Sequence, residues 1–405
     1  MKKYYLITLI LLINGVYNSL VVSQTSNQKP LENVFTLELT FGDKDVPDEY
    51  LLVRPMRLAI ALNGDIIVAD ESKLKVFDNS GKPKKIVGRQ GQGPGEFGVF
   101  PSQNVLENGN ICVTDINPRR FSLFSSDYTF INTKNLQNDP LYKNFAQEKG
   151  WRNIDITEIY PYSLDEIYIY AQTSVVTGGQ ISKRVCLMLY QKGGKIETIV
   201  ESSFEEIIYK NILTVHVSNG DLIQRLLPGK KVVYSETHKD KINENGKWFY
   251  IITEHNFNNN QRKMLIKHEY TPVAIPDSVI HPEKQKGYNG DDEVAMARIG
   301  EDVIKITRKE YDQKRTELYK ELKVYPPIIS IFADRDLIFV RTYKFEKNKG
   351  WLVDIFDSTT GKYLRSAYFP FIPEIKDGYA YRAVRGNNIF PYIEKYKINP
   401  AVYGK

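Results

Sequence analysis

Short apolar runs separated by polar turns recur along the first part of the chain. Between positions 55 and 87 the runs occupy 58–61, 65–69, 74–77 and 84–87. Asn63-Gly64 stands between the first two runs, and Asn-Gly between apolar segments is a strong signal of a tight hairpin turn. The pattern therefore predicts four short antiparallel strands joined by tight turns, which together make one β-propeller blade.

The same pattern appears again about one blade later. Gly64 and Gly109 stand 45 residues apart, and so do Asp70 and Asp115. A period of this length, with several short strands in each copy, is typical of a β-propeller. Further strand-like segments follow at 166–171, 185–190, 248–252, 328–332, 337–340 and 351–356. We therefore predict an all-β propeller of four-stranded antiparallel blades that extends from about residue 34 to residue 398.

One segment has the periodicity of a helix rather than of a strand. Thr307 and Glu310 have the spacing of a capping box, in which each side chain bonds to the backbone N–H of the other residue. The aromatic and apolar residues that follow share one helical face: Tyr311, Leu318, Tyr319 and Leu322. We predict one helix here, inserted between two blades and packed on the rim of the ring.

Three segments carry a resemblance to a known family. They are residues 63–70 (NGDIIVAD), 75–82 (KVFDNSGK) and 91–97 (GQGPGEF). They resemble the NHL-type blade and, more closely, the exported six-bladed β-propeller proteins of Bacteroidetes and related bacteria. The 45-residue period alone would allow seven or eight blades, whereas the resemblance implies six. It also implies that a strand at 34–41, where apolar and polar residues alternate, completes the last blade and closes the ring.

The N-terminal residues have the features of a targeting signal. Lys2 and Lys3 precede an apolar run, and Val21-Val22-Ser23 forms a small-residue cleavage site. The predicted divisions are a signal peptide at 1–23, a disordered leader at 24–33 and a single propeller domain at 34–405. No later segment is long and apolar enough to span a bilayer, so we expect an exported protein, periplasmic or extracellular. An uncleaved N-terminal anchor is the alternative.

The charge of the chain indicates which classes of partner to expect, and its cysteines indicate whether a disulfide bridge forms. The formal net charge is +6, and it becomes +4 when the two charges of Lys2 and Lys3 are removed. This excess is too small to indicate nucleic-acid binding. We expect a monomer with no nucleic-acid partner and no membrane span after signal cleavage. Cys112 and Cys186 lie in strand-like segments, which favours buried unpaired thiols over a disulfide bridge.

The sequence contains none of the common motifs of catalytic or metal sites. No Gly-x-Ser-x-Gly motif is present, and the acidic segment 288–293 lacks the spacing of an EF-hand loop. None of the five histidines has the spacing of a zinc site: His216, His238, His255, His268 and His281. We therefore predict no catalytic residue, no metal ligand and no cofactor. The ligand-binding residues are unknown from the sequence.

Two recurring features are better explained by the fold than by chemistry. Asp70 and Asp115 end equivalent strands, so we expect each to accept backbone N–H bonds in the turn that follows. Gly91, Gly93 and Gly95 invite a phosphate-loop hypothesis, but such a loop needs a following helix. A strand-like segment follows instead, so we predict a structural connection between two blades.

Taken together, these patterns favour binding over chemistry. The leading hypothesis is an exported, non-catalytic propeller that binds a protein, peptide or glycan ligand at one face of the ring, where loops gather around the channel mouth. Two alternatives stay open. One is a metal-dependent propeller lyase or lactonase with a site in the central channel, and the other is a structural or sensory module of a cell-envelope complex. Candidates for a binding surface are Phe369, Phe371, Tyr379, Tyr381 and Arg382.

Overall fold

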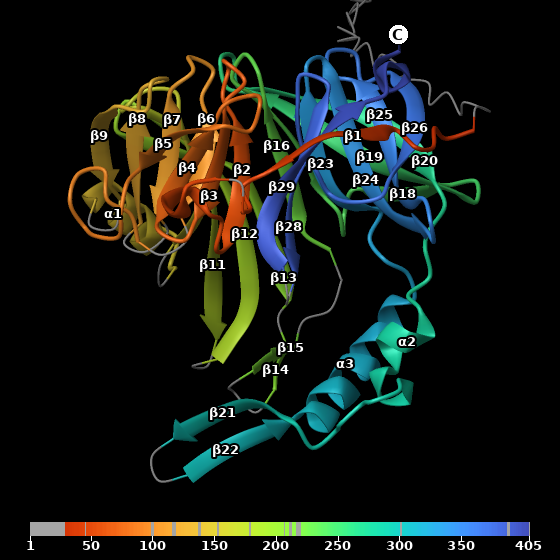
Figure 1. Ribbon diagram of the computed structural model, residues 1–405. Helices are drawn as coiled ribbons and strands as arrows, with labels where there is room; N and C mark the ends of the chain where they lie inside the picture. The colour runs from red at the N-terminus through yellow and green to blue at the C-terminus, as the bar shows by residue number, and fades with distance from the viewer. Residues whose placement is uncertain are drawn as a thin grey trace, which may run out of the picture.

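Six large antiparallel sheets form a ring, and a smaller arm extends from it (Figure 1). The structure is a computed structural model that describes residues 29–404 except 45, 99–100, 116–118, 137–138, 152–153, 178–179, 206, 210–212, 216–219, 300–301 and 387–388. The predicted signal peptide at 1–23 and His216 fall outside the described residues. Each large sheet is one blade, so the prediction of an all-β propeller with six four-stranded blades is confirmed.

The first two blades have the strands that the sequence repeat predicts. The first contains β2 (Pro55–Ile60), β3 (Ile66–Asp70), β4 (Lys73–Phe77) and β5 (Pro83–Val87). The second contains β6 (Ser102–Val105), β7 (Ile111–Asp115), β8 (Arg120–Phe124) and β9 (Phe130–Asn135). Gly64 has a φ of +87° in the turn between β2 and β3, a conformation that favours glycine over residues with a Cβ.

The next three blades keep the same order with longer strands. The third contains β10 (Asp155–Pro161), β11 (Glu166–Thr177), β12 (Gln180–Lys192) and β13 (Lys195–Glu205). The fourth contains β16 (Leu222–Leu227), β17 (Lys231–Glu236), β18 (Lys241–Glu244), β19 (Lys247–Asn256) and β20 (Gln261–Tyr270). The fifth contains β23 (Ile328–Asp334), β24 (Leu337–Glu346), β25 (Gly350–Asp357) and β26 (Tyr363–Phe369). In the fourth blade β17 and β18 pair with successive parts of one edge of β19, so together they take the place of one strand.

The N-terminal strand closes the ring. β1 (Phe35–Phe41) pairs with β29 (Ile389–Ile398), and the sheet continues through β28 (Tyr379–Gly386) to β27 (Glu374–Lys376). The pairing runs from Phe35 opposite Ile398 to Phe41 opposite Ile393. The sixth blade therefore joins both ends of the chain, as the resemblance implies, and this pairing protects a sheet edge that would otherwise be open.

The disordered leader expected at 24–33 is wrong at its C-terminal end. Leu31 forms a parallel bridge with Ala367, and its backbone exchanges hydrogen bonds with Ser366 and Tyr368 at 2.9 Å. The Leu31 side chain also packs against the apolar cluster shared by the fifth and sixth blades. The gain from this contact outweighs the entropy that an exposed leader would keep.

The predicted helix forms, but not where we expected it. α3 (Arg308–Leu322) begins with the capping box of Thr307 and Glu310. It does not pack on the rim of the ring. It belongs to an arm, residues 271–327, that extends away from the blades (Figure 1). The arm also contains α2 (Asp277–Ile280), η2 (Pro282–Lys284), β21 (Glu293–Ile299) and β22 (Asp302–Thr307). α3 makes its hydrogen bonds within the arm, where Arg315 and Thr316 donate to carbonyls of α2.

Two helices escaped the sequence analysis, α2 and α1 (Pro140–Glu148). Asp139 is the N-cap of α1 and Pro140 its first residue, and both are ordinary signals of a helix start. The remaining elements are the hairpin of β14 (Ile207–Tyr209) and β15 (Leu213–Val215), η1 (Asp48–Tyr50) and η3 (Pro400–Tyr403).

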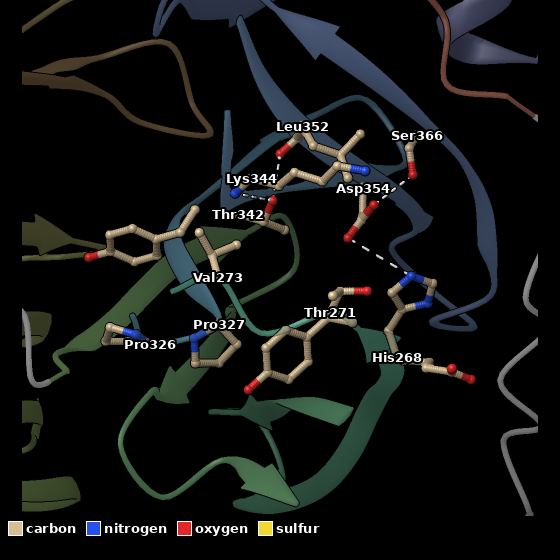
Figure 2. Close-up of a pocket in the computed structure, with 13 residues that line it drawn as sticks. His268, Thr271, Val273, Pro326, Pro327, Thr342, Lys344, Leu352, Asp354 and Ser366 are labelled. Carbon is tan, nitrogen blue, oxygen red and sulfur yellow. Dashed lines mark hydrogen bonds and ion pairs between the residues drawn. The ribbon is translucent and has the colours of Figure 1, made fainter. Parts of the chain in front are cut away.

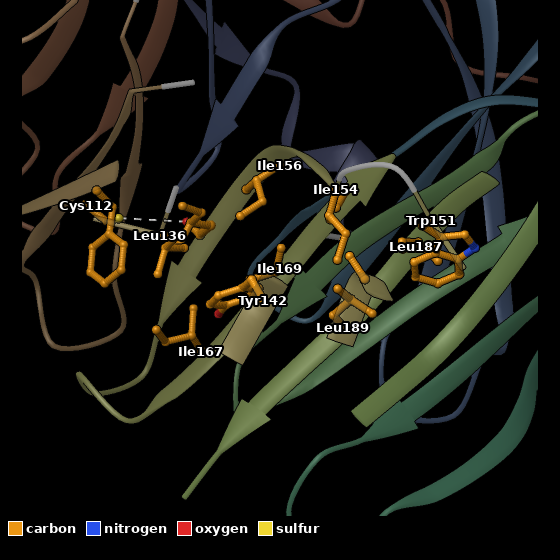
Figure 3. Close-up of a cluster of buried hydrophobic side chains, with 14 of the residues drawn as sticks. Cys112, Leu136, Tyr142, Trp151, Ile154, Ile156, Ile167, Ile169, Leu187 and Leu189 are labelled. Atoms are coloured by element: carbon orange, nitrogen blue, oxygen red, sulfur yellow. Dashed lines mark hydrogen bonds between the residues drawn. The ribbon is translucent and has the colours of Figure 1, made fainter. Parts of the chain in front are cut away.

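Apolar faces hold neighbouring blades together. Between the second and third blades Cys112 packs with Ile159 and Ile167, and α1 adds Tyr142 (Figure 3). Burial of a side chain as large as isoleucine contributes roughly 1.5–3 kcal/mol to the free energy of unfolding. Because the buried side chains come from both neighbours, each interface stabilises two blades. Cys112 and Cys186 lie in different blades and both thiols are free, which confirms the prediction of buried unpaired cysteines.

Candidate functional site

A large cavity, here called the central channel, occupies the middle of the ring. Its volume is about 960 Å³, near the upper end of the range of small-molecule sites, roughly 300–1,000 Å³. The inner strand of every blade contributes to its wall: β2, β6, β10, β16, β23 and β27. The lining includes the C-terminal end of each inner strand and, on every blade except the sixth, the turn that follows, so one mouth of the channel lies where the inner strands end. Met56 and Ile372 lie near the starts of β2 and β27, towards the other end.

Apolar side chains stay exposed on the wall of the channel. Met56, Leu62 and Ile372 line the cavity and are 38%, 56% and 58% exposed. Tyr160 and Tyr162 add aromatic surface on the third blade. Large apolar groups that remain accessible in a concave surface are a usual feature of a binding site, because a ligand can remove them from water.

The turn after β6 reaches across the mouth. The Glu107 carboxylate accepts a hydrogen bond from the backbone N–H of Gly229 at 3.0 Å, and the N–H of Glu107 donates to the Tyr160 hydroxyl at 3.0 Å. These bonds connect the second, third and fourth blades. They hold this side of the mouth in one shape before a ligand arrives, which lowers the entropy lost on binding.

Four of the ten charged residues that line the channel come from the inner strands of four different blades. Arg57 lies on β2, Glu158 on β10, Arg225 on β16 and Glu374 on β27. A guanidinium nitrogen of Arg225 is 3.8 Å from a carboxylate oxygen of Glu374. Glu158, in contrast, has a neutral partner, because the side-chain amide of Gln224 donates a hydrogen bond to its carboxylate at 2.8 Å.

The channel changes the acidity of Glu374. Burial raises the pKa of Glu374, the positive charges of Arg225 and Arg57 oppose the rise, and the negative charges of Glu158 and Asp334 add to it. The side chain nevertheless keeps 36% of its surface accessible, because it is enclosed by the ring while still facing the channel. Charged groups in such a site interact with a bound ligand more strongly than they would on an open surface.

A second, smaller pocket of about 270 Å³ lies between the fourth and fifth blades, at the base of the arm. Figure 2 shows Asp354 between Ser366 and His268 on one side, with Pro326 and Pro327 of the arm on the other. We call it the inter-blade pocket. It brings together four strands of the two neighbouring blades, β20, β24, β25 and β26, and the segments that join the arm to the ring.

Asp354 is the acceptor that joins the side chains of the inter-blade pocket, whereas Nδ1 of His268 is buried without a hydrogen-bond partner among the described residues. The Asp354 carboxylate accepts hydrogen bonds from the Ser366 hydroxyl at 2.6 Å and from the Tyr250 hydroxyl at 2.9 Å. The nearest ring nitrogen of His268 is 3.9 Å from this carboxylate. Burial lowers the pKa of His268, and the charge of Asp354 opposes the change. The network joins two blades, and this structural role accounts for its geometry.

The recurring aspartates, Asp70 and Asp115, each bind the backbone of the segment that precedes the first strand of their own blade. Asp70 accepts the backbone N–H of Arg54 at 2.5 Å and pairs with Lys75 at 2.8 Å. Asp115 accepts the backbone N–H of Gly98 at 2.7 Å. Our expectation that the following turn supplies the donors is wrong, because each strand ends beside the connection that leads into its own blade.

The glycine-rich segment joins the first blade to the second and leads into strand β6, as predicted. Arg120 is buried beneath it and donates to three of its backbone carbonyls, between positions 91 and 96. Gly88 has a φ of +75°, and a Cβ there would come within 2.1 Å of the Phe97 ring. The glycines thus let the backbone fold closely around a buried cation.

The residues that the sequence suggested as a binding surface do not all lie on one surface of the structure. Tyr381 and Arg382 line the central channel. Phe369 is buried in the core, and the rings of Phe371 and Tyr379 lie beneath basic side chains. Among the described residues, no three His, Cys, Asp or Glu side chains are grouped so that they could hold a metal ion. In the segment 288–293, Asp292 and Glu293 face basic side chains at 3.8 and 2.8 Å.

Sequence reasoning missed the charges of the channel. They lie far apart in the chain, and only the closed ring brings them together. The one signal was a charged residue inside an apolar inner strand, as in 55–60 (PMRLAI) and 222–227 (LIQRLL). A side chain that faces an apolar core is rarely charged. An arginine inside an apolar strand therefore indicates a position that faces water or a ligand.

Comparison with known proteins identifies the family. The family described as "6-bladed beta-propeller" (DUF5128) matches residues 14–227. The chain belongs to this family. The resemblance to exported Bacteroidetes propellers of six blades is thereby confirmed.

Solved structures from Bacteroides are similar in fold. One is "a Putative exported protein" from Bacteroides fragilis, with a TM-score of 0.47 and 11% identity over 92% of this chain and 97% of that chain. Another is a member of the DUF4221 family from Bacteroides vulgatus, with a TM-score of 0.44 and 11% identity over 91% of this chain and 99% of that chain. A search of curated proteins finds no match. Within the part of the chain that the structure describes, no helix is long and apolar enough to cross a membrane.

Proposed function

We propose that this protein is an exported, non-catalytic binding protein that holds a peptide, or a segment of a protein, at the mouth of the central channel. The observation that carries the proposal is the wall of the channel, where Met56, Leu62 and Ile372 remain exposed beside charged side chains. A wall of this kind binds apolar side chains by removing them from water, and its charges orient the ligand.

The architecture supports this function. The lining residues stand on inner strands that hydrogen bonds hold in register on one side, and the bonds of Glu107 fix the turns at the mouth. Groups on such a rigid frame need little reorganisation when a ligand binds. A peptide fits better than an unbranched glycan, because the channel combines separate apolar and charged surfaces.

Export is part of the proposal. It is supported by the predicted signal peptide at 1–23 and by the similarity to a Bacteroides fragilis protein that is described as exported. We expect a monomer that acts outside the cytoplasm and needs no nucleic acid.

The test is a binding screen with a variant at the mouth. Immobilised full-length mature chain is exposed to pools of peptides and of oligosaccharides, and bound molecules are measured by mass spectrometry. Leu62→Asp places a charge on an exposed turn of the channel, and it should reduce peptide binding at least tenfold. Leu164→Asp is the matched control, because Leu164 is 43% exposed in a turn outside the channel lining, and its binding should be unchanged.

Other outcomes would overturn the proposal. Equal binding by Leu62→Asp and the parent chain would place the ligand elsewhere. Binding of oligosaccharides but not of peptides would replace the ligand class. Turnover of a lactone or of a lyase substrate that a chelator abolishes and one metal restores would favour the enzyme alternative.

The arm favours a second candidate, a module of a cell-envelope complex. Met296 and Val303 on its hairpin are 60% and 47% exposed, and the arm extends away from the ring (Figure 1). Replacement of residues 277–323 by a short Gly-Ser linker should leave peptide binding by the channel intact if the arm serves a separate partner. Loss of peptide binding in this variant, with an unchanged melting temperature, would contradict that separation.

A further inference from the structure

Four of the ten charged residues that line the central channel are arranged in two mixed pairs. Arg57 and Glu374 stand on the first and sixth blades, which are neighbours in the closed ring, and Glu158 and Arg225 stand on the third and fourth. In a ring of six, blades one and four face each other, and so do blades three and six. The two arginines are therefore on opposite walls, and so are the two glutamates.

These side chains do not neutralise one another fully. The Arg57 guanidinium makes no hydrogen bond or ion pair with any residue that the structure describes, although it carries five donors. Arg225 approaches Glu374 only to 3.8 Å, which is longer than a charge-assisted hydrogen bond. Glu158 accepts from a neutral amide rather than from a cation. Donors and acceptors of both signs are thus left for a ligand.

A purely anionic or purely cationic ligand would meet like charge from two of these four side chains. A carboxylate near Glu158 or Glu374, like an ammonium near Arg57 or Arg225, is repelled at a cost of several kcal/mol in a desolvated interface. A ligand that carries one charge of each sign avoids this cost.

We propose that the central channel recognises short peptides by their free ends, with the amino end on Glu158 and the carboxylate on Arg57, beside the pair of Arg225 and Glu374. This inference rests on the proposed function and names its ligand class. The exposed Met56, Leu62 and Ile372 then contact the side chains of the peptide, and the volume of about 960 Å³ accommodates more than a single amino acid.

The experiment compares peptide pools that differ only at their ends. A pool of tripeptides is offered to the full mature chain with both ends free, with acetylated amino ends, or with amidated carboxyl ends, and retained peptides are quantified by mass spectrometry. Each blocked pool should bind at least tenfold more weakly than the free pool, because blocking removes a hydrogen bond between two charged groups, and tenfold corresponds to about 1.4 kcal/mol.

Variants assign each end of the peptide to its residues. Arg57→Gln should bind free and amidated pools equally, and Glu158→Gln should bind free and acetylated pools equally. Arg89→Gln and Glu201→Gln are matched controls outside the channel lining, where both side chains are in exposed ion pairs. Both control variants should still bind the free pool at least tenfold more tightly than either blocked pool. Circular dichroism and melting curves show which variants are folded.

The outcomes separate this inference from the proposed function. Equal binding of all pools by the parent chain, with loss in Leu62→Asp, would overturn recognition of the ends and leave peptide binding at the mouth in place. A lack of binding by every peptide pool would overturn both. Because the pool comparison uses the unmodified chain, an unfolded variant does not affect its result.

Discussion

The central channel and the inter-blade pocket use polar side chains in opposite ways. In the inter-blade pocket, Asp354 takes hydrogen bonds from Tyr250 and Ser366. In the channel, the Arg57 guanidinium has no hydrogen-bond or ion-pair partner among the described residues, and Arg225 reaches its nearest carboxylate only at 3.8 Å. A buried polar group that is satisfied by its neighbours stabilises the fold, whereas one that keeps unused donors is available to a ligand. The difference explains why the larger cavity, and not the tighter network, is the candidate site.

The largest expected effect is on stability, in the inter-blade pocket. Asp354→Ala leaves two buried hydroxyl donors without their charged acceptor, so we expect the free energy of unfolding to fall by about 3 kcal/mol. Glu158→Ala in the channel should cost less than about 1 kcal/mol, because water can replace the lost carboxylate. Urea unfolding of both variants measures the contrast. Equal losses would show that the two sites are not built differently.

The next effect is a dependence on pH in the same pocket. Burial lowers the pKa of His268, so the unfolded chain takes up a proton at a higher pH than the folded chain does. Stability should therefore fall as the pH decreases below about 6.5, by at most about 1.4 kcal/mol per pH unit for one proton.

A variant isolates the contribution of His268. Because burial also lowers the pKa of His238 and His255, the useful quantity is the difference between the parent chain and His268→Asn. That difference, from urea unfolding at pH 7.5, 6.5 and 5.5, should shrink steadily on acidification. A constant difference would contradict the prediction.

Glu374 should show the reverse dependence. Burial raises the pKa of Glu374, so the folded chain holds this proton more tightly than the unfolded chain, and stability is lost as the pH rises through the raised pKa. Glu374→Gln should then be more stable than the parent chain at pH 7, by less than about 1 kcal/mol because solvent in the channel screens the charge. The gain should vanish below about pH 4. A variant that is less stable at pH 7 would show that the pair with Arg225 stabilises the fold.

The smallest expected effect is that of Arg57→Gln on stability. Since Arg57 is exposed in the channel and unpaired among the described residues, the melting temperature should change by an amount equivalent to no more than about 0.5 kcal/mol. A larger loss, measured by calorimetry, would mean that Arg57 supports the ring, and it would weaken the case for a ligand-binding role.

Much of the fold follows from local sequence signals. The four strands of the first blade, the turn at Gly64 and the capping box of α3 each depend on residues a few positions apart. The same holds for the strand at 35–41, whose alternation was visible. Its pairing with β29 was implied only by the resemblance, because strand pairing between the two ends of a chain leaves no local signal.

The errors share one cause. Asp70 was expected to bond forward in the chain, and it bonds back to Arg54. α3 was expected on the rim, and it lies in the arm with α2. In both cases the residue type was interpreted correctly, but its partner depends on which distant segment lies next to it.

The blades of this protein can be predicted from local features of the chain, because the alternation of side chains, the turn residues and the repeat act over short distances. The channel cannot, because it exists only in the closed ring. Arg57, Glu158, Arg225 and Glu374 face a common space because six sheets close into a ring, and closure depends on packing between whole blades. Each charge alone resembles an ordinary polar residue in a strand. They form a candidate binding site only because the ring brings them to one channel, and no single segment of the chain specifies that arrangement.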